Sequence, residues 1–171
     1  PKNVRYTIAL AELKKIDKNL SEAMDLYLEA FLLEPNRYDL LETAGRFAIN
    51  LNDADKAKSI FKELSKAIPD EERYLGIFID LVSRSNSFDE GIDHIKELNN
   101  IHGETTGRRG QLGLLYYRSG STDKAHELLE SVISESPNNP NYYFSLFDIY
   151  MEKSNNKKAA ELGDELIANY P

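Results

Sequence analysis

Apolar and small side chains recur in register every 34 residues along this chain. One position of the repeat holds the apolar residues Leu10, Ala44, Phe78, Leu112 and Leu146, and a second holds Tyr27, Phe61, Ile95 and Leu129. Two further positions hold small residues, Ala11, Gly45 and Gly113 at the first and Ala23, Ala57, Gly91, Ala125 and Ala159 at the second. Large side chains in phase fill the grooves between stacked helices, and small ones let helices approach closely. The pattern predicts a repeated pair of packed helices.

Helix breakers stand on the same spacing. Proline breaks helices because it lacks an N–H and clashes with the preceding helical turn. Five helix-breaking residues lie 34 positions apart: Pro35, Pro69, Gly103, Pro137 and Pro171. This spacing predicts a single array over residues 4–171, with repeats 4–37, 38–71, 72–105, 106–139 and 140–171, after an N-terminal remnant 1–3. Short polar segments inside the repeats, such as Asn50 to Asp53, predict a turn between two helices of about a dozen residues each.

Acidic residues follow several of these turns. Asp55, Asp89 and Asp123 stand at the start of the second helix in three repeats. A carboxylate there satisfies free N–H groups and meets the positive end of the helix dipole. We therefore expect these three residues to cap helices rather than to act in catalysis.

The fourth repeat carries the most specific motif of the chain. Leu112-Gly113-x-x-Tyr116 lies in its first helix, Ala125 in its second and Pro137 at its end, and the first repeat adds Ala23, Tyr27, Ala30 and Pro35. In this motif, and in keeping one register over five units, the chain resembles the tetratricopeptide repeat family. The resemblance implies an all-α fold, a right-handed superhelical solenoid of about five antiparallel helix-pair repeats.

Departures from the family pattern concentrate in the third and fifth repeats. In the third, Ile79 replaces the small residue of the first helix and Gly103 replaces the terminal Pro. In the fifth, Phe147 stands where glycine is usual and Gly163 where an aromatic residue is usual, which predicts a large-for-small exchange across one helix pair. The third repeat is the weakest match to the family.

The charge balance excludes one large class of partner. The formal net charge is −8 and the isoelectric point is near 5.0, whereas nucleic-acid binding needs a basic surface that displaces counterions. We therefore expect no nucleic-acid partner. No apolar run of about 18 residues predicts a membrane span, and Pro1-Lys2-Asn3 begins no signal peptide. We therefore expect a soluble chain.

The compartment stays open between cytoplasm, periplasm and the outside of the cell. The chain has no cysteine, which excludes disulfides and thiolate chemistry but fits all three compartments. The start at Pro1 without Met indicates a fragment or a processed chain.

The sequence contains no constellation typical of catalysis or metal binding. His94, His102 and His126 are too widely spaced for a compact metal site. The run Gly107 to Gly113 forms G-x-x-G-x-x-G, but it lacks both the spacing and the preceding strand of a phosphate-binding loop. We therefore expect no enzyme activity, no cofactor and no metal.

The family resemblance implies a binding surface on the concave face, which the first helix of each repeat lines. The corresponding positions of the last three repeats and the groove rim hold Arg73, Asp80, Arg84, Gly110, Leu114, Tyr117, Arg118, Phe144, Asp148 and Met151. Aromatic residues and Met provide a large and adaptable contact area, and glycines lower the floor of a groove. The alternative is that the large apolar members of this set only pack against neighbouring helices.

Two functions of different classes remain open. The first, which we favour, is a non-catalytic scaffold that binds a peptide or helix of a partner protein in the concave groove, within a larger assembly such as a bacterial secretion or envelope system. The second is a structural spacer or self-association module. Leu162, Leu166 and Ile167 bear on both, because they close the last repeat without the polar cap that terminal repeats need. A partner, a second copy or further chain is expected to cover them.

Overall fold

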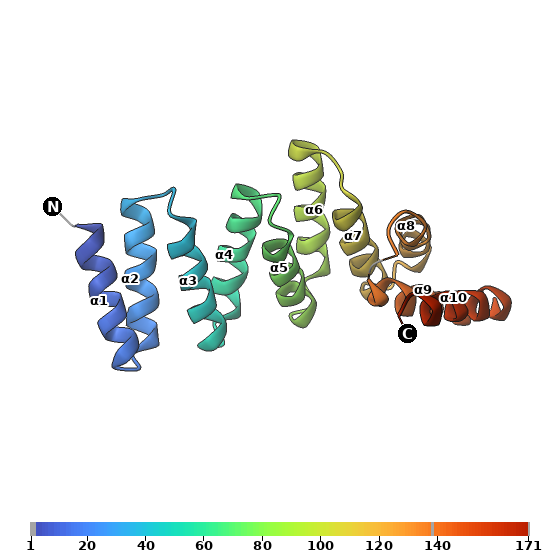
Figure 1. Cartoon of the computed structure of the whole chain (residues 1–171), viewed down its shortest axis with the longest axis horizontal. Helices are drawn as coiled ribbons and strands as arrows, with labels where there is room; N and C mark the ends of the chain where they lie inside the picture. The colour runs from blue at the N-terminus through green and yellow to red at the C-terminus, as the bar shows by residue number, and fades with distance from the viewer. Residues whose placement is uncertain (1–2, 138, 171) are drawn as a thin grey trace. The chain divides into compact units, whose positions relative to one another are not determined.

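The structure is a computed structural model that describes residues 3–137 and 139–170. In these residues it contains α-helices and no strand (Figure 1). The helices are α1 (Val4–Ile16), α2 (Leu20–Leu33), α3 (Tyr38–Asn50), α4 (Ala54–Ala67), α5 (Glu72–Arg84), α6 (Phe88–His102), α7 (Thr106–Arg118), α8 (Thr122–Glu135), α9 (Pro140–Glu152) and α10 (Asn156–Asn169). They form the all-α solenoid of helix pairs that the sequence predicts.

Pro and Gly residues follow the second helices of the pairs. Helices α2, α4 and α8 each end two residues before a proline, namely Pro35, Pro69 and Pro137. Helix α6 ends at His102, and the next residue is Gly103, whose φ of 80° lies in the left-handed region that glycine adopts without strain. Pro171, the last predicted breaker, lies outside the described residues.

The turn within each pair contains one residue with left-handed backbone geometry. These residues are Lys18, Asn52, Asn86, Gly120 and Ser154, and their φ angles are 60°, 57°, 53°, 79° and 56°. They share one position of the 34-residue repeat. The same tight turn therefore reverses the chain five times, although only one of the five residues is glycine.

The helix caps differ from the sequence-based expectation. Asp53 Oδ1 accepts a hydrogen bond from Lys56 N at 3.1 Å and caps α4, whereas Asp55 lies one residue inside the helix. Asp89 and Asp123 likewise lie in the first turns of α6 and α8, near the positive end of the dipole. Their predicted capping role is therefore wrong, because the residue before each helix occupies the cap position. Asn3, which we placed before the first repeat, caps α1.

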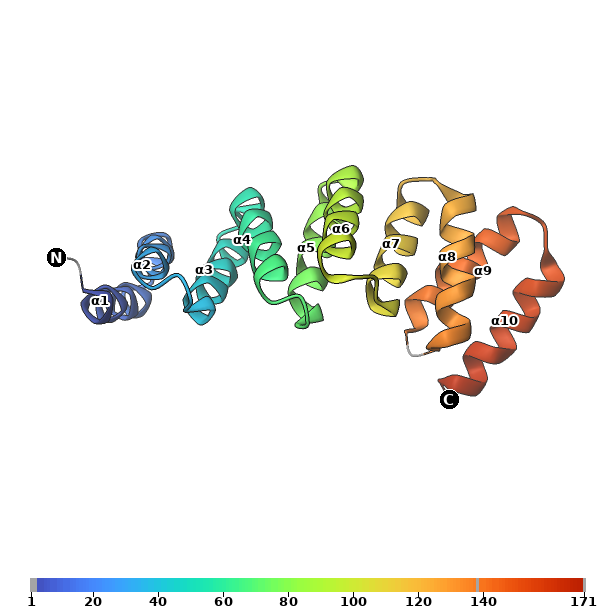
Figure 2. The same cartoon turned by 90° about the horizontal axis from the view of Figure 1, so that it is seen from above.

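Two compact units divide the chain, unit 1 (Pro1–Leu81) and unit 2 (Val82–Pro171). In unit 1, α1 packs on α2, α2 on α3, and α3 on α4. In unit 2, α6 packs on α7, α7 on α8, α8 on α9, and α9 on α10, while α7 also contacts α9 (Figure 2). These helices therefore pack on neighbours close to them in the chain, as in other repeat proteins.

Small residues lie where neighbouring helices approach most closely. Ala11 and Ala23 are fully buried between α1 and α2. A Cβ built on Gly45 of α3 would lie 2.9 Å from side-chain atoms of Ile60 and Phe61 of α4. Glycine is thus required at this helix crossing, as the sequence pattern indicates.

The apolar repeat positions form the core, with one exception. Phe78, Leu112 and Leu146 are buried, whereas Leu10 at the same repeat position is 43% exposed. The prediction that Leu10 fills a groove between helices is therefore wrong in this structure. The described residues contain no helix before α1 against which Leu10 could pack.

Candidate functional site

The residues predicted for partner binding divide between the two units. Arg73 and Asp80 belong to unit 1 and the other eight to unit 2. Arg73 Nη2 donates a hydrogen bond to Glu42 Oε2 at 3.1 Å, and the Tyr74 hydroxyl donates to the same oxygen at 2.7 Å. Arg73 thus links α5 to α3, and Asp80 is exposed on α5.

Gly110 and Leu114 do not line an open face. The Leu114 side chain is only 6% exposed and lies in the core of unit 2 with Leu129 and Leu146. A Cβ on Gly110 would lie 2.4 Å from Cζ and the hydroxyl oxygen of Tyr142, so an α9 side chain already covers this glycine. The predictions that Gly110 lowers the floor of an open groove and that Leu114 lines this groove are wrong, because α9 packs over that part of α7. For Leu114 the structure shows the alternative, packing against neighbouring helices.

The two arginines predicted at the groove rim are both exposed. Arg84 is the last residue of α5 and Arg118 is the last residue of α7. Arg118 Nη1 donates a hydrogen bond to Ser83 Oγ at 2.7 Å. The guanidinium of Arg118 therefore ties the end of α7 to the end of α5.

The remaining four residues lie together and form the surface that we call the α9 face: Tyr117, Phe144, Asp148 and Met151. Phe144, Asp148 and Met151 follow one another at helical spacing on α9, and the exposed fractions of Phe144 and Met151 are 57% and 48%. The Tyr117 hydroxyl of α7 donates a hydrogen bond to Asp148 Oδ2 at 2.9 Å. The structure thus brings these four predicted residues together.

Carboxylates determine the electrostatics of the α9 face. Burial, and then the hydrogen bond to Asp148, raise the pKa of Tyr117, so its hydroxyl stays protonated and keeps donating. Glu152 also acts on Tyr117 through its charge, and both acidic side chains are exposed. The α9 face therefore combines large apolar side chains with negative charge.

A second apolar surface lies beside the α9 face, where α9 meets α10. We call it the end groove: it encloses about 220 Å³ and is lined by Tyr143, Phe144, Phe147, Leu162, Gly163, Leu166 and Ile167. No atom lies within 4 Å of a Cβ built on Gly163, and Phe147 is 37% exposed. Phe147 therefore does not fill the space that Gly163 leaves, so the predicted large-for-small exchange leaves an open groove.

The sequence signal for this surface was incomplete. The sequence pattern identifies Leu162, Leu166 and Ile167 as an uncapped end, but it assigns neither Tyr143 nor Phe147 to a surface. Their apolar character at helical spacing is also typical of core residues. Only the exposure of the Phe147 side chain shows that this residue lines a surface and does not belong to the core.

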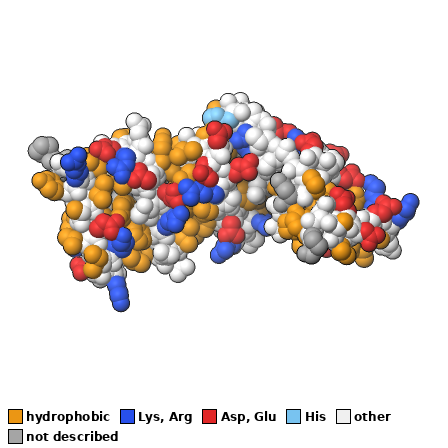
Figure 3. Space-filling model, viewed as in Figure 1, with side chains coloured by type: hydrophobic (Ala, Val, Ile, Leu, Met, Phe, Trp, Pro, Cys, Tyr) orange, Lys and Arg blue, Asp and Glu red, His pale blue; other side chains and the backbone are white. Residues whose placement is uncertain are grey.

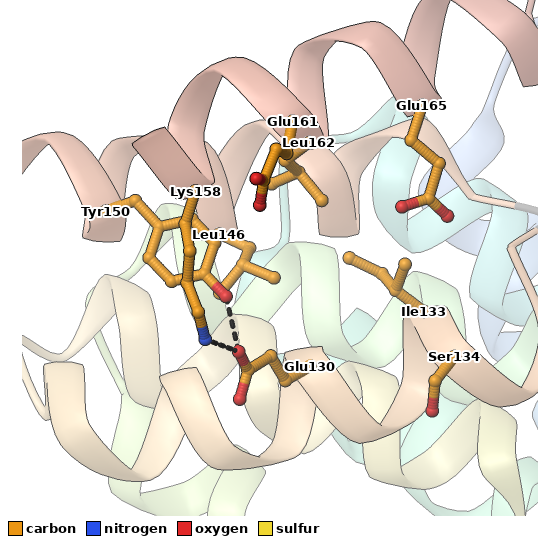
Figure 4. A pocket seen from close by; sticks show the side chains of 9 residues that line it. All are labelled: Glu130, Ile133, Ser134, Leu146, Tyr150, Lys158, Glu161, Leu162 and Glu165. Carbon is orange, nitrogen blue, oxygen red and sulfur yellow. Dashed lines mark hydrogen bonds and ion pairs between the residues drawn. The ribbon is translucent and has the colours of Figure 1, made fainter. Parts of the chain in front are cut away.

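A polar pocket of about 340 Å³ lies between α8, α9 and α10 (Figure 4). Glu130 Oε1 accepts hydrogen bonds from the Tyr150 hydroxyl at 2.5 Å and from Lys158 Nζ at 2.7 Å. These bonds, that of Lys158 first, hold the pKa of Glu130 below its usual range. Glu130 thus links three consecutive helices, α8, α9 and α10. These structural hydrogen bonds account for its lowered pKa, so no catalytic role is needed to explain it.

Residues 3–137 and 139–170 contain no group of three or more His, Cys, Asp or Glu side chains arranged to hold a metal ion. In the same part of the chain, every helix is too short or too polar to cross a bilayer.

Comparisons with known proteins agree with the fold. Two family models, both described as tetratricopeptide repeat, match residues 16–77 and 111–139. Together with the helix pairs, these matches show that the chain belongs to the tetratricopeptide repeat family. No curated protein matches the chain in sequence.

Solved structures with a similar fold cover nearly the whole chain. MamA 41-end from Desulfovibrio magneticus RS-1 has a TM-score of 0.68 at 17% identity, over 96% of this chain and 93% of that one. YrrB, described as a TPR protein with an unusual peptide-binding site, has a TM-score of 0.64 at 19% identity, over 96% and 85%. TTC0263, a thermophilic TPR protein in Thermus thermophilus, has a TM-score of 0.61 at 16% identity, over 99% and 92%.

At these identities the likeness concerns the fold. Proteins of this family are generally non-catalytic scaffolds, and family and fold together support a protein-interaction scaffold with protein partners.

Proposed function

We propose that this chain is a non-catalytic scaffold whose α9 face binds a helix or extended peptide of a partner protein. The observation that carries the proposal is the exposure of Phe144 and Met151 at helical spacing beside the Tyr117–Asp148 hydrogen bond. Large aromatic and Met side chains that stay exposed in a folded protein are typical of interaction surfaces. The secretion or envelope context expected from the family resemblance stays a prediction.

The chemistry of the α9 face defines the partner segment. Phe144 and Met151 are separated by two helical turns, so apolar side chains at a similar spacing on the partner match them. Asp148 and Glu152 add negative charge beside them. We therefore expect a segment that combines apolar with Lys or Arg side chains, and whose binding weakens as salt increases.

A peptide display selection tests the proposal. The probe is a library of randomised helical peptides, selected on the immobilised chain. We expect the selected peptides to carry apolar and basic residues, and to bind Phe144→Glu or Met151→Glu at least about tenfold more weakly. Circular dichroism of each variant confirms that it is folded.

Leu32→Glu is the matched control. Leu32 is a large apolar residue of α2, 76% exposed, and its repeat equivalents Lys66 and Ser134 are polar and exposed. It should bind the selected peptides like the wild type. The proposal fails if those peptides bind the folded Phe144→Glu and Met151→Glu variants as tightly as the wild type.

A further inference from the structure

The polar pocket between α8, α9 and α10 has an apolar floor. Ile133 of α8, Leu146 of α9 and Leu162 of α10 line it, and all three side chains are buried members of the core of unit 2. The volume of about 340 Å³ lies at the lower end of the range for ligand pockets. Such a floor favours an aliphatic group, because a bare ion would lose hydration there without gaining polar contacts.

Glutamates of α8 and α10 surround this floor. Glu130 lies on α8, and Lys158, Glu161 and Glu165 lie at helical spacing on the side of α10 that lines the pocket. The Lys158 ammonium pairs with the Glu130 carboxylate at 2.7 Å, so these two charges cancel. Glu161 and Glu165 therefore leave the pocket with an excess of negative charge.

The partners that Glu161 and Glu165 have within the chain compensate little of this charge. Glu161 Oε1 lies 3.7 Å from Lys157 Nζ, and both side chains are largely exposed, so water screens this pair. Glu165 Oε1 accepts a hydrogen bond from the Tyr143 hydroxyl at 3.0 Å, but that donor carries no charge. A carboxylate can accept several hydrogen bonds, so both side chains retain the capacity to bind a cation.

Lys158 shows how this pocket holds an ammonium group. Its Nζ donates a hydrogen bond to Glu130 and lies 5.3 Å from the centre of the Tyr150 ring. Lys158 and Tyr150 lie at one end of the pocket, and Ser134 and Glu165 lie at the other (Figure 4). Lys158 is the only cationic side chain among the nine described residues that line the pocket. The second end thus has a carboxylate and a hydroxyl but no ammonium from these residues.

We propose that this second end binds a primary alkylammonium group. The ammonium lies between Glu161, Glu165 and the Ser134 hydroxyl. Its methylene stem lies on Leu146 and Ile133. A linear diamine and a lysine side chain of a protein both carry this group. The inference goes beyond the proposed function, because the polar pocket shares no residue with the α9 face.

An apolar floor beneath glutamates distinguishes this place from the equivalent place one repeat earlier, between α6 and α8. There the residue equivalent to Glu165 is Ser131, and the residue equivalent to Ile133 is Asn99. Asn99 Oδ1 accepts a hydrogen bond from Arg108 Nε at 2.9 Å. Acidic and basic side chains are interspersed over the surface that Figure 3 shows, so charge alone does not single out a site. The combination of charge with an aliphatic floor does.

NMR titration of the isotope-labelled chain with the linear diamine cadaverine tests the proposal. We expect saturable shifts of the amide signals of Ser134, Glu161 and Glu165, with a Kd on the order of 1 mM at low salt. Added salt should weaken binding, because it screens the ion pairs. Methylammonium carries the charge without the stem, and n-pentanol carries the stem without the charge. Each should bind more weakly than cadaverine.

A second titration identifies the source of the alkylammonium group. N-acetyl-lysine methylamide presents it as a lysine side chain of a protein does. Shifts of the same signals with a Kd similar to that of cadaverine support a protein lysine as the ligand. Binding of cadaverine alone supports a free amine.

Glutamine variants remove the charge of the site and keep its size. The double variant Glu161→Gln/Glu165→Gln should bind cadaverine at least about fivefold more weakly. Asp164→Asn is the matched control, since Asp164 is an exposed carboxylate of α10 that does not line the pocket. It should bind like the wild type. Met151→Glu should bind no more weakly than the wild type, so this site and the α9 face can fail independently.

Three results would overturn the proposal. The first is the absence of saturable shifts at these residues up to about 100 mM cadaverine. The second is equal binding of n-pentanol, which would show that the charge plays no part. The third is a double variant that binds cadaverine as tightly as Asp164→Asn does, while its spectrum shows that it is folded.

Discussion

The ring of Tyr142 lies directly over Gly110, and a Cβ on Gly110 would come within 2.4 Å of Tyr142 Cζ. Tyr142 is itself buried, so its ring cannot swing away without disturbing the core of unit 2. This pair joins α9 to α7, the two helices that also share the Tyr117–Asp148 hydrogen bond. The contact between Gly110 and Tyr142 therefore fixes the position of α9 on α7, and this position determines where the side chains of the α9 face lie.

Gly110→Ala should destabilise the protein despite the higher helix propensity of alanine. The added methyl group forces Tyr142 to move, and overpacking of this kind costs about 1–3 kcal/mol. Urea denaturation measures the change in the free energy of unfolding. A Gly110→Ala protein as stable as the wild type would contradict the close approach of the two helices.

Gly163→Ala should have the opposite effect. Gly163 lies inside α10, and a Cβ there meets no atom within 4 Å. Alanine should therefore add only helix propensity and raise the free energy of unfolding by up to about 1 kcal/mol. The same urea experiment checks this. A loss of stability would show that the end groove is narrower than the structure indicates.

Reciprocal exchanges at the left-handed turn residues should change stability in opposite directions. Ser154 has a φ of 56°, and its repeat equivalent Gly120 has a φ of 79°. A side chain in this region costs about 1–2 kcal/mol. Ser154→Gly should therefore raise the melting temperature, and Gly120→Ser should lower it. Equal and same-sign shifts for the two variants would contradict the shared turn geometry.

Tyr150 should make stability depend on pH in the alkaline range. Burial, and then the hydrogen bond to Glu130, raise the pKa of Tyr150 from 10.0 to about 12 in the folded protein. Because the folded pKa is the higher one, the stabilisation is fully present below pH 10 and is lost as pH rises toward about 12. The difference in unfolding free energy between wild type and Tyr150→Phe should shrink over this interval. A constant difference would place Tyr150 outside the Glu130 hydrogen-bond network.

Helix boundaries follow from local properties that can be read along the chain. Pro35, Pro69 and Pro137 end helices through their own ring, and Gly45 and Ala23 permit close approach by their small size. Because these effects act within one repeat or between adjacent helices, the 34-residue pattern was enough to predict a solenoid of helix pairs. The cap assignments at Asp55, Asp89 and Asp123 failed by two residues, since several polar residues in each turn suit the cap position.

Burial of equivalent positions depends on neighbours that the pattern does not specify. Leu10 and Leu146 occupy the same repeat position, yet Leu10 is exposed while Leu146 is buried. Helices α7 and α8 pack on α9, whereas the described residues contain no helix before α1. In the same way, Leu114 lies in the core while Phe144 and Met151 stay exposed. The amino-acid sequence thus determined the repeat, its helices and its family. The tertiary structure decided which apolar side chains remain available for a partner, because exposure depends on contacts with helices that pack from other repeats.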